Sequence, residues 1–155
     1  LYENPDALPN AFLVGCTHIS EDTWSDLPTL QPRRWALVES DIGVPECDDG
    51  GDAGTATVVS YEAQRVVIDV EAKDTAVLVQ NDTHYPLRWR AEIDGRRVSI
   101  HRINHTFRGV VVPPGRHRIA LWYRAPDWTM VFPLLIWFAF LFLMEWGPMR
   151  TTRSS

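Results

Sequence analysis

Over residues 1–127 the apolar and polar side chains alternate in short runs, and this alternation predicts β-strands. In "RVVIDVEA" (residues 65–72) the apolar residues Val66, Ile68 and Val70 fall on every second position, which places them on one face of a strand. We predict further strands in "AFLVGC" (11–16), "RWALVES" (34–40), "ATVVSYE" (56–62), "TAVLVQND" (75–82), "RWRAEI" (88–93), "RRVSIHRI" (96–103), "FRGVVV" (107–112) and "RHRIALWYR" (116–124). Many short strands separated by turns indicate an all-β protein, and we predict a β-sandwich over residues 1–127.

The segments between these strands contain the residues that turns require. Asp94-Gly95 separates two predicted strands, and an Asp-Gly pair suits the positive φ angles of a two-residue hairpin turn. Pro114-Gly115 fits the central positions of a type II turn. Residues 20–30 predict a short helix with Ser20 as its N-cap and Pro28 near its end. Residues 41–56, rich in Gly and Asp and without apolar periodicity, predict a flexible acidic loop.

The alternation stops at Asp127, and the segment that follows is apolar on every face. Seventeen residues, 128–144, carry no charge, and we predict a single transmembrane helix over residues 128–146 with a short cytoplasmic tail at 147–155. Trp128 and Trp146 lie at the two ends of this segment, where membrane proteins place aromatic residues, and Trp137 lies within it. The alternative is a helix buried against another subunit. Arg150 and Arg153 in the tail favour a cytoplasmic C-terminus, and hence a β-domain on the extracytoplasmic side.

The charge of the 155-residue chain, −5 in total, is divided unevenly. Residues 1–60 have a net charge of −9, whereas residues 61–127 have a net charge of +3. An acidic first half opposes the phosphates of nucleic acid, so we expect no nucleic-acid partner. His101 and His105, with Asp82, lack the spacing of a known zinc site, and "ECDDGGD" lacks the order of an EF-hand loop. We therefore expect no metal and no cofactor.

The chain has two cysteines, Cys16 and Cys47. In an oxidising compartment they could form a disulfide between the first strand and the acidic loop, stabilising the domain by about 3 kcal/mol. Two free, buried thiols are the alternative.

Several motifs occur together in an order that is specific to one family. They are "YENPDALPNAFLV" (2–14), "ATVVSYEAQRVVIDVEA" (56–72), "LVQNDTHYP" (78–86) and "WRAEIDGRRVSIHRINHTFRGVVVPPGRHRIALWYRAP" (89–126). This order resembles the C-terminal, extracytoplasmic part of the YfhO-like family of bacterial membrane proteins, which are similar to lipid-linked-sugar glycosyltransferases. The resemblance implies a β-rich domain followed by a last membrane helix.

The chain departs from the family pattern in one motif. The family has Tyr-Pro-Gly-Trp where this chain has Leu87 and Arg88 between Pro86 and Trp89. The catalytic acids of such transferases lie in early loops between membrane helices, to which nothing here corresponds, so the resemblance carries over no catalytic residue.

Two functions are compatible with these features. The first, which we favour, is a non-catalytic accessory or scaffold subunit in the bacterial inner membrane. It is anchored by one helix and docks on a larger respiratory, photosynthetic or transport complex. The second is the C-terminal domain of a YfhO-like glycosyltransferase, with an exposed Trp89 or Trp122 stacking on sugar.

Strand alternation points to a docking or membrane-interface surface in the last strand. It places Ile119, Leu121 and Tyr123 inward and Trp122 outward, with Arg118 and Arg124 on either side. Trp and Arg are enriched both in binding hot spots and at membrane interfaces. We add Trp128, Trp137 and Trp146 of the helix to this set, with membrane lipid and other subunits as the expected partners. Ala139 is the only small residue in the helix, so we expect no homodimer through it.

Overall fold

The computed structural model describes residues 7–85, 87–124 and 128–145. The chain divides into two compact units, Leu1–Arg124 and Ala125–Ser155. The first unit is built almost entirely of strands, as the alternating sequence predicted, and the all-β class is therefore confirmed.

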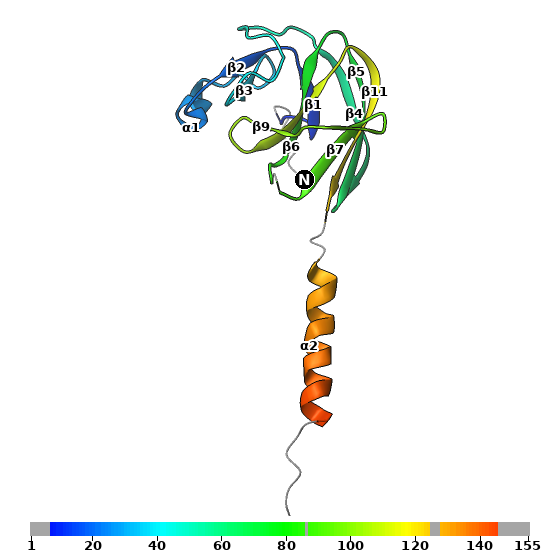
Figure 1. The fold of residues 1–155 in the computed structure, drawn as a ribbon. Coiled ribbons are helices and arrows are strands. Elements are labelled where there is room, and N and C mark those ends of the chain that lie inside the picture. Colours follow the sequence, from blue (N-terminus) through cyan, green and yellow to red (C-terminus); the bar gives the residue numbers. More distant parts are fainter. Residues whose placement is uncertain (1–6, 86, 125–127, 146–155) are drawn as a thin grey trace, which may run out of the picture. The chain divides into compact units, whose positions relative to one another are not determined.

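Two antiparallel sheets form the first unit (Figure 1). The four-stranded sheet has the order β1 (Ala11–Val14), β6 (Ala76–Thr83), β10 (Phe107–Val112), β9 (His101–Ile103). The five-stranded sheet has the order β4 (Gly54–Glu62), β5 (Arg65–Ala72), β11 (Gly115–Tyr123), β7 (Trp89–Ile93), β8 (Arg96–Val98). Consecutive strands such as β4 and β5 form hairpins, whereas β11 returns to pair with both β5 and β7.

The two sheets share one apolar core. Val66, Ile68 and Val70 of β5 are buried, in agreement with the period of two in their sequence. They pack with Leu78 of β6 and Val110 of β10, which belong to the opposite sheet. Burial of such side chains contributes about 1.5–3 kcal/mol each, so this layer is the main source of stability.

The Asp94-Gly95 turn between β7 and β8 has the predicted geometry. Asp94 has φ 50° and Gly95 has φ 80°, both in the left-handed region that a two-residue turn of this kind requires. Gly115, at the start of β11, has φ 119°, as the positive φ of the Pro-Gly turn demanded.

A smaller group of elements lies to one side of the sheets (Figure 1). It contains the parallel strands β2 (Thr17–Ile19) and β3 (Ala36–Val38), the one-turn helix α1 (Thr23–Asp26) and the 3₁₀ turn η1 (Leu27–Thr29). The predicted helix over 20–30 is thus much shorter than expected, and Ser20 is not its N-cap. Ser20 Oγ donates to Asp26 Oδ2 at 2.5 Å, and Asp22 caps α1 by accepting from the backbone N–H groups of Trp24 and Ser25.

The second unit contains the helix α2 (Trp128–Glu145), so the predicted helix is present. None of the helices within the described residues combines the length and the apolar character that a membrane crossing needs. The prediction of a transmembrane span over 128–146 is therefore not confirmed. Trp146 and the predicted tail at 147–155 lie outside the described residues.

Candidate functional site

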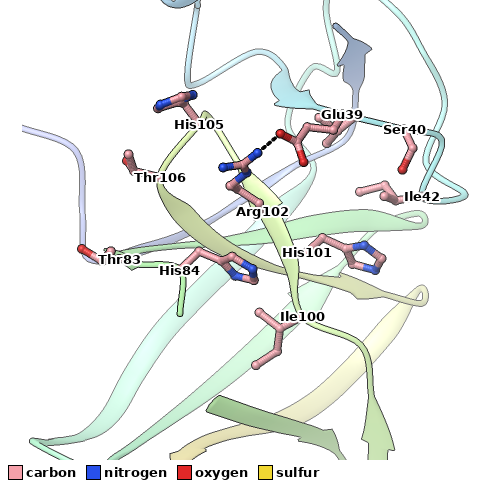
Figure 2. A pocket seen from close by; sticks show the side chains of 11 residues that line it. Glu39, Ser40, Ile42, Thr83, His84, Ile100, His101, Arg102, His105 and Thr106 are labelled. Carbon is pink, nitrogen blue, oxygen red and sulfur yellow. Dashed lines mark hydrogen bonds and ion pairs between the residues drawn. The ribbon is translucent and has the colours of Figure 1, made fainter. Parts of the chain in front are cut away.

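A hollow of about 600 Å³ in the first unit contains three histidines. Figure 2 shows its walls, which come from the end of β6, from β9 and its following turn, and from the residues after β3. The lining residues are Val38, Glu39, Ser40, Ile42, Thr83, His84, Ile100, His101, Arg102, His105 and Thr106. An ion pair between Glu39 and Arg102 crosses the hollow (Figure 2).

Burial favours the neutral form of two of these imidazoles. Burial lowers the pKa of His84 and of His101, and the positive charge of Arg102 lowers the pKa of His84 further. His105 is held differently, because its Nδ1 lies 2.9 Å from the hydroxyl of Thr23 in α1. Among the described residues no three His, Cys, Asp or Glu side chains are arranged to hold a metal ion. The hollow is thus a polar pocket whose charge depends on pH.

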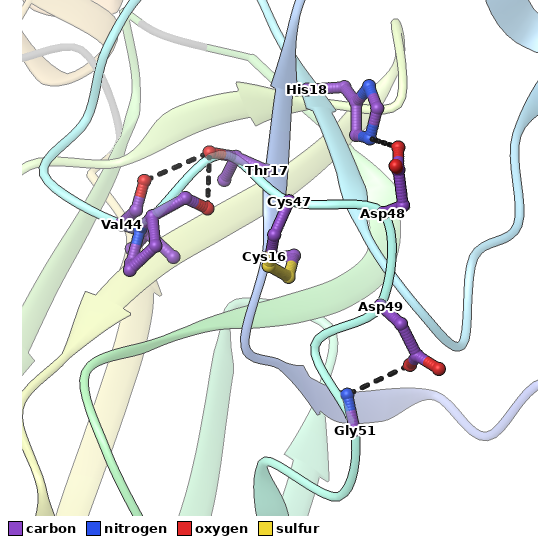
Figure 3. Close-up of a disulfide and its surroundings, with 9 residues drawn as sticks. Cys16, Thr17, His18, Val44, Cys47, Asp48, Asp49 and Gly51 are labelled. Atoms are coloured by element: carbon purple, nitrogen blue, oxygen red, sulfur yellow. Dashed lines mark hydrogen bonds and ion pairs between the residues drawn. A yellow bond between two sulfur atoms is a disulfide. The ribbon is translucent and has the colours of Figure 1, made fainter.

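Cys16 and Cys47 form a disulfide, with their Cα atoms 5.3 Å apart (Figure 3). Cys16 is fully buried and packs with Trp35 and Leu37 in a small core of its own. The bond links residues that are 31 positions apart, a loop whose closure is worth about 3–4 kcal/mol. It holds the β2–β3 group together where there are few apolar contacts.

The acidic loop is held more firmly than its composition indicated. Thr17 donates its backbone N–H to Pro45 and its hydroxyl to Val44, at 2.9 and 3.0 Å (Figure 3). Val44 is buried, and Gly50 packs so closely against the Arg34 carbonyl that a Cβ atom there would lie 2.8 Å from it. The expected flexible loop over 41–56 is therefore pinned by main-chain contacts, and its last three residues belong to β4.

A charged network that the sequence analysis missed lies at one end of the sheets. Arg108 of β10 is 2% exposed, and its Nη2 donates to Asp82 Oδ2 at 2.7 Å. Asp82 also accepts from Tyr61 and Gln80, while the ring of Trp89 covers the Arg108 guanidinium at 3.6 Å. These five residues, which we call the Arg108 network, come from both sheets. They connect β6 and β10 to β4 and β7.

The Arg108 network contains groups that are not fully satisfied. Nε and Nη1 of Arg108 and Oε1 of Gln80 are buried without a hydrogen-bond partner in the described residues. Burial lowers the pKa of Arg108, which the neighbouring Asp82 opposes, and the hydrogen bond to Asp82 raises the pKa of Tyr61. The sequence indicated an inward Arg108, because residues two positions apart in a strand point to the same face. Val110 and Val112, two and four positions after Arg108, are both buried.

The predicted docking residues of β11 have different surroundings in the structure. Ile119 and Leu121 are buried, as expected. Arg118 makes a two-bonded ion pair with Asp69, at 2.7 and 2.8 Å, so its guanidinium is occupied. Trp122 lies instead in a hollow of about 430 Å³ with Glu62, Gln64, Arg65, Glu92 and Tyr123, which we call the Trp122 hollow.

The other predicted docking or membrane-interface residues are Arg124, at the end of the first unit, and three tryptophans that follow it in the chain. Arg124 is exposed, and its backbone N–H donates to the carbonyl of Arg88 at 2.8 Å. Trp128 begins α2, but its side chain lies outside what the structure describes, as does all of Trp146. Trp137 is 64% exposed and meets Phe140 edge-on, with their ring centroids 6.5 Å apart.

Trp89, the other predicted sugar-stacking residue, is engaged within the protein. One ring contact is with Arg108 and another, edge-on at 5.9 Å, is with Tyr123. Of the two tryptophans considered for ligand stacking, Trp122 is thus the one in an open hollow.

No protein-family model, curated protein or solved structure matches the chain.

Proposed function

We propose that the chain is a non-catalytic, membrane-anchored accessory subunit. Its β-rich unit lies on the extracytoplasmic side of a bacterial inner membrane, α2 is its single anchor, and it docks on a larger membrane-protein complex. The apolar surface of α2 docks on that complex, and Trp122 is a membrane-interface residue of the β-rich unit.

The observation that carries this proposal is the surface of α2. Seven large apolar side chains in its middle are each about half or more exposed: Leu135, Ile136, Trp137, Phe138, Phe140, Leu141 and Phe142. Consecutive residues of a helix point in different directions, so these side chains cover its whole circumference. Leaving them in water costs on the order of 10 kcal/mol in total. An apolar surface of this kind requires a cover of lipid or of another protein.

The length of α2 indicates whether lipid or protein surrounds its apolar side chains. Its 18 residues make a helix about 27 Å long, slightly shorter than a hydrocarbon layer of roughly 30 Å. A short helix is accommodated by local thinning of the bilayer or by packing against neighbouring helices. The aromatic rings of α2 and its lack of small residues favour a different protein as that neighbour.

The disulfide supports the extracytoplasmic side. Disulfides form and persist in oxidising compartments, which in bacteria lie outside the cytoplasm. The Cys16–Cys47 bond, which joins residues 31 positions apart, therefore supports an extracytoplasmic β-rich unit.

Flotation with lipid vesicles tests the anchor. The full chain is mixed with vesicles of phosphatidylcholine and phosphatidylethanolamine and centrifuged through a density gradient. We expect it to float, and we expect Phe138→Arg together with Leu141→Arg to abolish flotation, because charged side chains in the hydrocarbon layer are costly. A full chain that remains at the bottom of the gradient in plain buffer as a monodisperse species would contradict the anchor.

Co-purification from native membranes tests docking. We expect Trp122→Ala with Trp137→Ala to reduce the recovery of partner subunits while the melting temperature of the β-rich unit stays unchanged. Trp24→Ala is the control, because Trp24 is 66% exposed but lies on α1, away from the proposed surface. Equal recovery for the docking and control variants would leave α2 as an anchor alone.

A second function is favoured by the motif order. The segments that resemble the YfhO-like family contain β1 and the successive strands β4 to β11, so the chain would be the C-terminal domain of a membrane glycosyltransferase. Trp122 would then contact carbohydrate. The length of the intact gene product separates the two: a chain several times longer with many apolar segments indicates the transferase, and one near this length indicates the subunit.

A further inference from the structure

The outer face of the five-stranded sheet differs between its two ends. Near Gly115 the charges neutralise one another: Arg116 pairs with Glu71, Arg118 pairs with Asp69, and His117 pairs with Asp94. Near Tyr123 they do not. Within the described part of the chain, Glu62, Glu92 and Arg65 take part in no ion pair, although all three line the Trp122 hollow.

Strand register places these uncompensated charges around the tryptophan. Trp122 is the direct cross-strand neighbour of Arg65 on β5 and of Arg90 on β7. Directly opposite residues point to the same face, so the indole lies between two arginines. Among the described residues, the Arg90 guanidinium donates to the carbonyl of Trp89 and the Glu62 carboxylate accepts from the hydroxyl of Ser60. Both the carboxylates and the guanidiniums around Trp122 can therefore form further hydrogen bonds with a ligand.

Two carboxylates and one guanidinium that line the hollow and form no ion pair among the described residues match a ligand that also carries both signs. A simple anion would be attracted by the arginines but repelled by the carboxylates. A simple cation would be attracted by the carboxylates but repelled by the arginines, so neither binds strongly. A molecule that has a phosphate and an ammonium a few bonds apart satisfies both. Guanidinium binds phosphate through paired N–H groups, and a carboxylate accepts from ammonium.

We propose that the Trp122 hollow is a docking surface for zwitterionic phosphoethanolamine headgroups at a lipid surface. Arg65 binds the phosphate, Glu62 and Glu92 accept from the ammonium, and Trp122 takes the position in the headgroup layer that indoles prefer. Trp122 precedes Trp128, the first residue of α2, by six positions in the chain. The inference rests on the membrane anchor proposed above and assigns the lipid face of the β-rich unit.

The test follows the Trp122 resonance in full chain labelled with 5-fluorotryptophan, assigned by its loss in Trp122→Phe. In nonionic detergent the chain is titrated with free O-phosphoethanolamine, and separately with inorganic phosphate and with ethanolamine. We expect a saturable shift with phosphoethanolamine and much weaker binding of the two fragments. Glu62→Gln with Glu92→Gln should weaken the binding about tenfold, which corresponds to roughly 1.4 kcal/mol.

A matched variant controls for unspecific charge effects. Glu71→Gln removes a carboxylate from the same sheet face at the opposite end, where it is paired with Arg116. We expect it to leave the binding of phosphoethanolamine unchanged. Unaltered resonances of the other tryptophans show that each variant is folded. If Glu71→Gln weakens binding as much as the Glu62 and Glu92 changes, the hollow is not the site and the inference is wrong.

The second arm places the full chain in nanodiscs of phosphatidylethanolamine that contain a lipid with a nitroxide on its headgroup. We expect the Trp122 resonance to broaden, and to broaden less in the Glu62→Gln, Glu92→Gln variant. If the free compound shifts the resonance but the nitroxide does not broaden it, the hollow binds a soluble zwitterion and the lipid inference is overturned. If phosphoethanolamine does not shift the Trp122 resonance and the nitroxide does not broaden it, the inference is also wrong. A chain that does not stay with the nanodiscs contradicts the anchor itself, which is a separate result.

Discussion

Removing the charge of Asp82 gives the sharpest test of how the two sheets are held together. In Asp82→Asn the side chain keeps its shape, but the buried guanidinium of Arg108 loses the one carboxylate that pairs with it in the described part of the chain. Tyr61 and Gln80 lose the acceptor that they share. The stacked Trp89 ring remains, yet it replaces only part of the lost interaction.

The magnitude follows from the burial of the two partners. Breaking a buried ion pair by removing one partner costs about 3–5 kcal/mol, because the other charge is left uncompensated. Arg108 is 2% exposed, but the Asp82 side chain is 32% exposed, so water can partly replace the carboxylate. We therefore expect a loss of about 3 kcal/mol in the free energy of unfolding. For a domain of this size that is a fall in melting temperature of about 10 °C.

Urea unfolding of the full chain in nonionic detergent, followed by tryptophan fluorescence and near-UV circular dichroism, measures this loss. Asp69→Asn is the matched control, because it breaks the exposed ion pair with Arg118 and should change stability far less. In a double variant, Arg108→Met should restore much of the stability lost in Asp82→Asn, since it removes the uncompensated charge. A loss below about 1 kcal/mol for Asp82→Asn, or a loss equal to that of the control, would refute this account of the network.

Three further predictions concern the disulfide and the histidines. Cys47→Ala should lower the free energy of unfolding by about 3–4 kcal/mol in urea titrations, and reduction of the native chain should lower it by a similar amount. The lowered pKa values of His84 and His101 mean that the unfolded chain binds protons more readily. The stability that they contribute is therefore present above pH 6.5 and lost as the pH falls through the folded pKa; melting temperatures that do not fall between pH 8 and pH 5 would contradict this. The hydrogen bond to Asp94 raises the pKa of His117, so its contribution is present below pH 6.5 and lost as the pH rises. Asp94→Asn should return that pKa to its ordinary range in an NMR titration, and an unchanged value would show that the pair is not formed in solution.

The sequence alone determined most of the strands and the Asp94-Gly95 turn, because both depend on local rules. The run predicted as one strand over 96–103 is instead divided between β8 and β9, which belong to different sheets. Alternation in β5 identified the buried face that includes Ile68, since successive side chains of a strand point to opposite sides. The Asp94-Gly95 pair specified a hairpin, since few other residues tolerate two positive φ angles. The apolar run after Asp127 predicted a helix because its residues are apolar on every face, and α2 continues through Pro133.

Only the tertiary structure decided which charges meet. Arg118 and Arg65 are equivalent as outward arginines in sequence, but register pairs the first with Asp69 and places the second beside Trp122. Alternation with Val110 and Val112 indicates an inward position for Arg108, but only the packing of the two sheets joined it to Asp82, a residue 26 positions away. The short helix α1 and the pinned acidic loop depended likewise on distant contacts, because a single turn of helix and a glycine-rich segment are not stable by themselves. Cross-strand register and sheet packing join residues that are far apart in the chain, so no local pattern contains them.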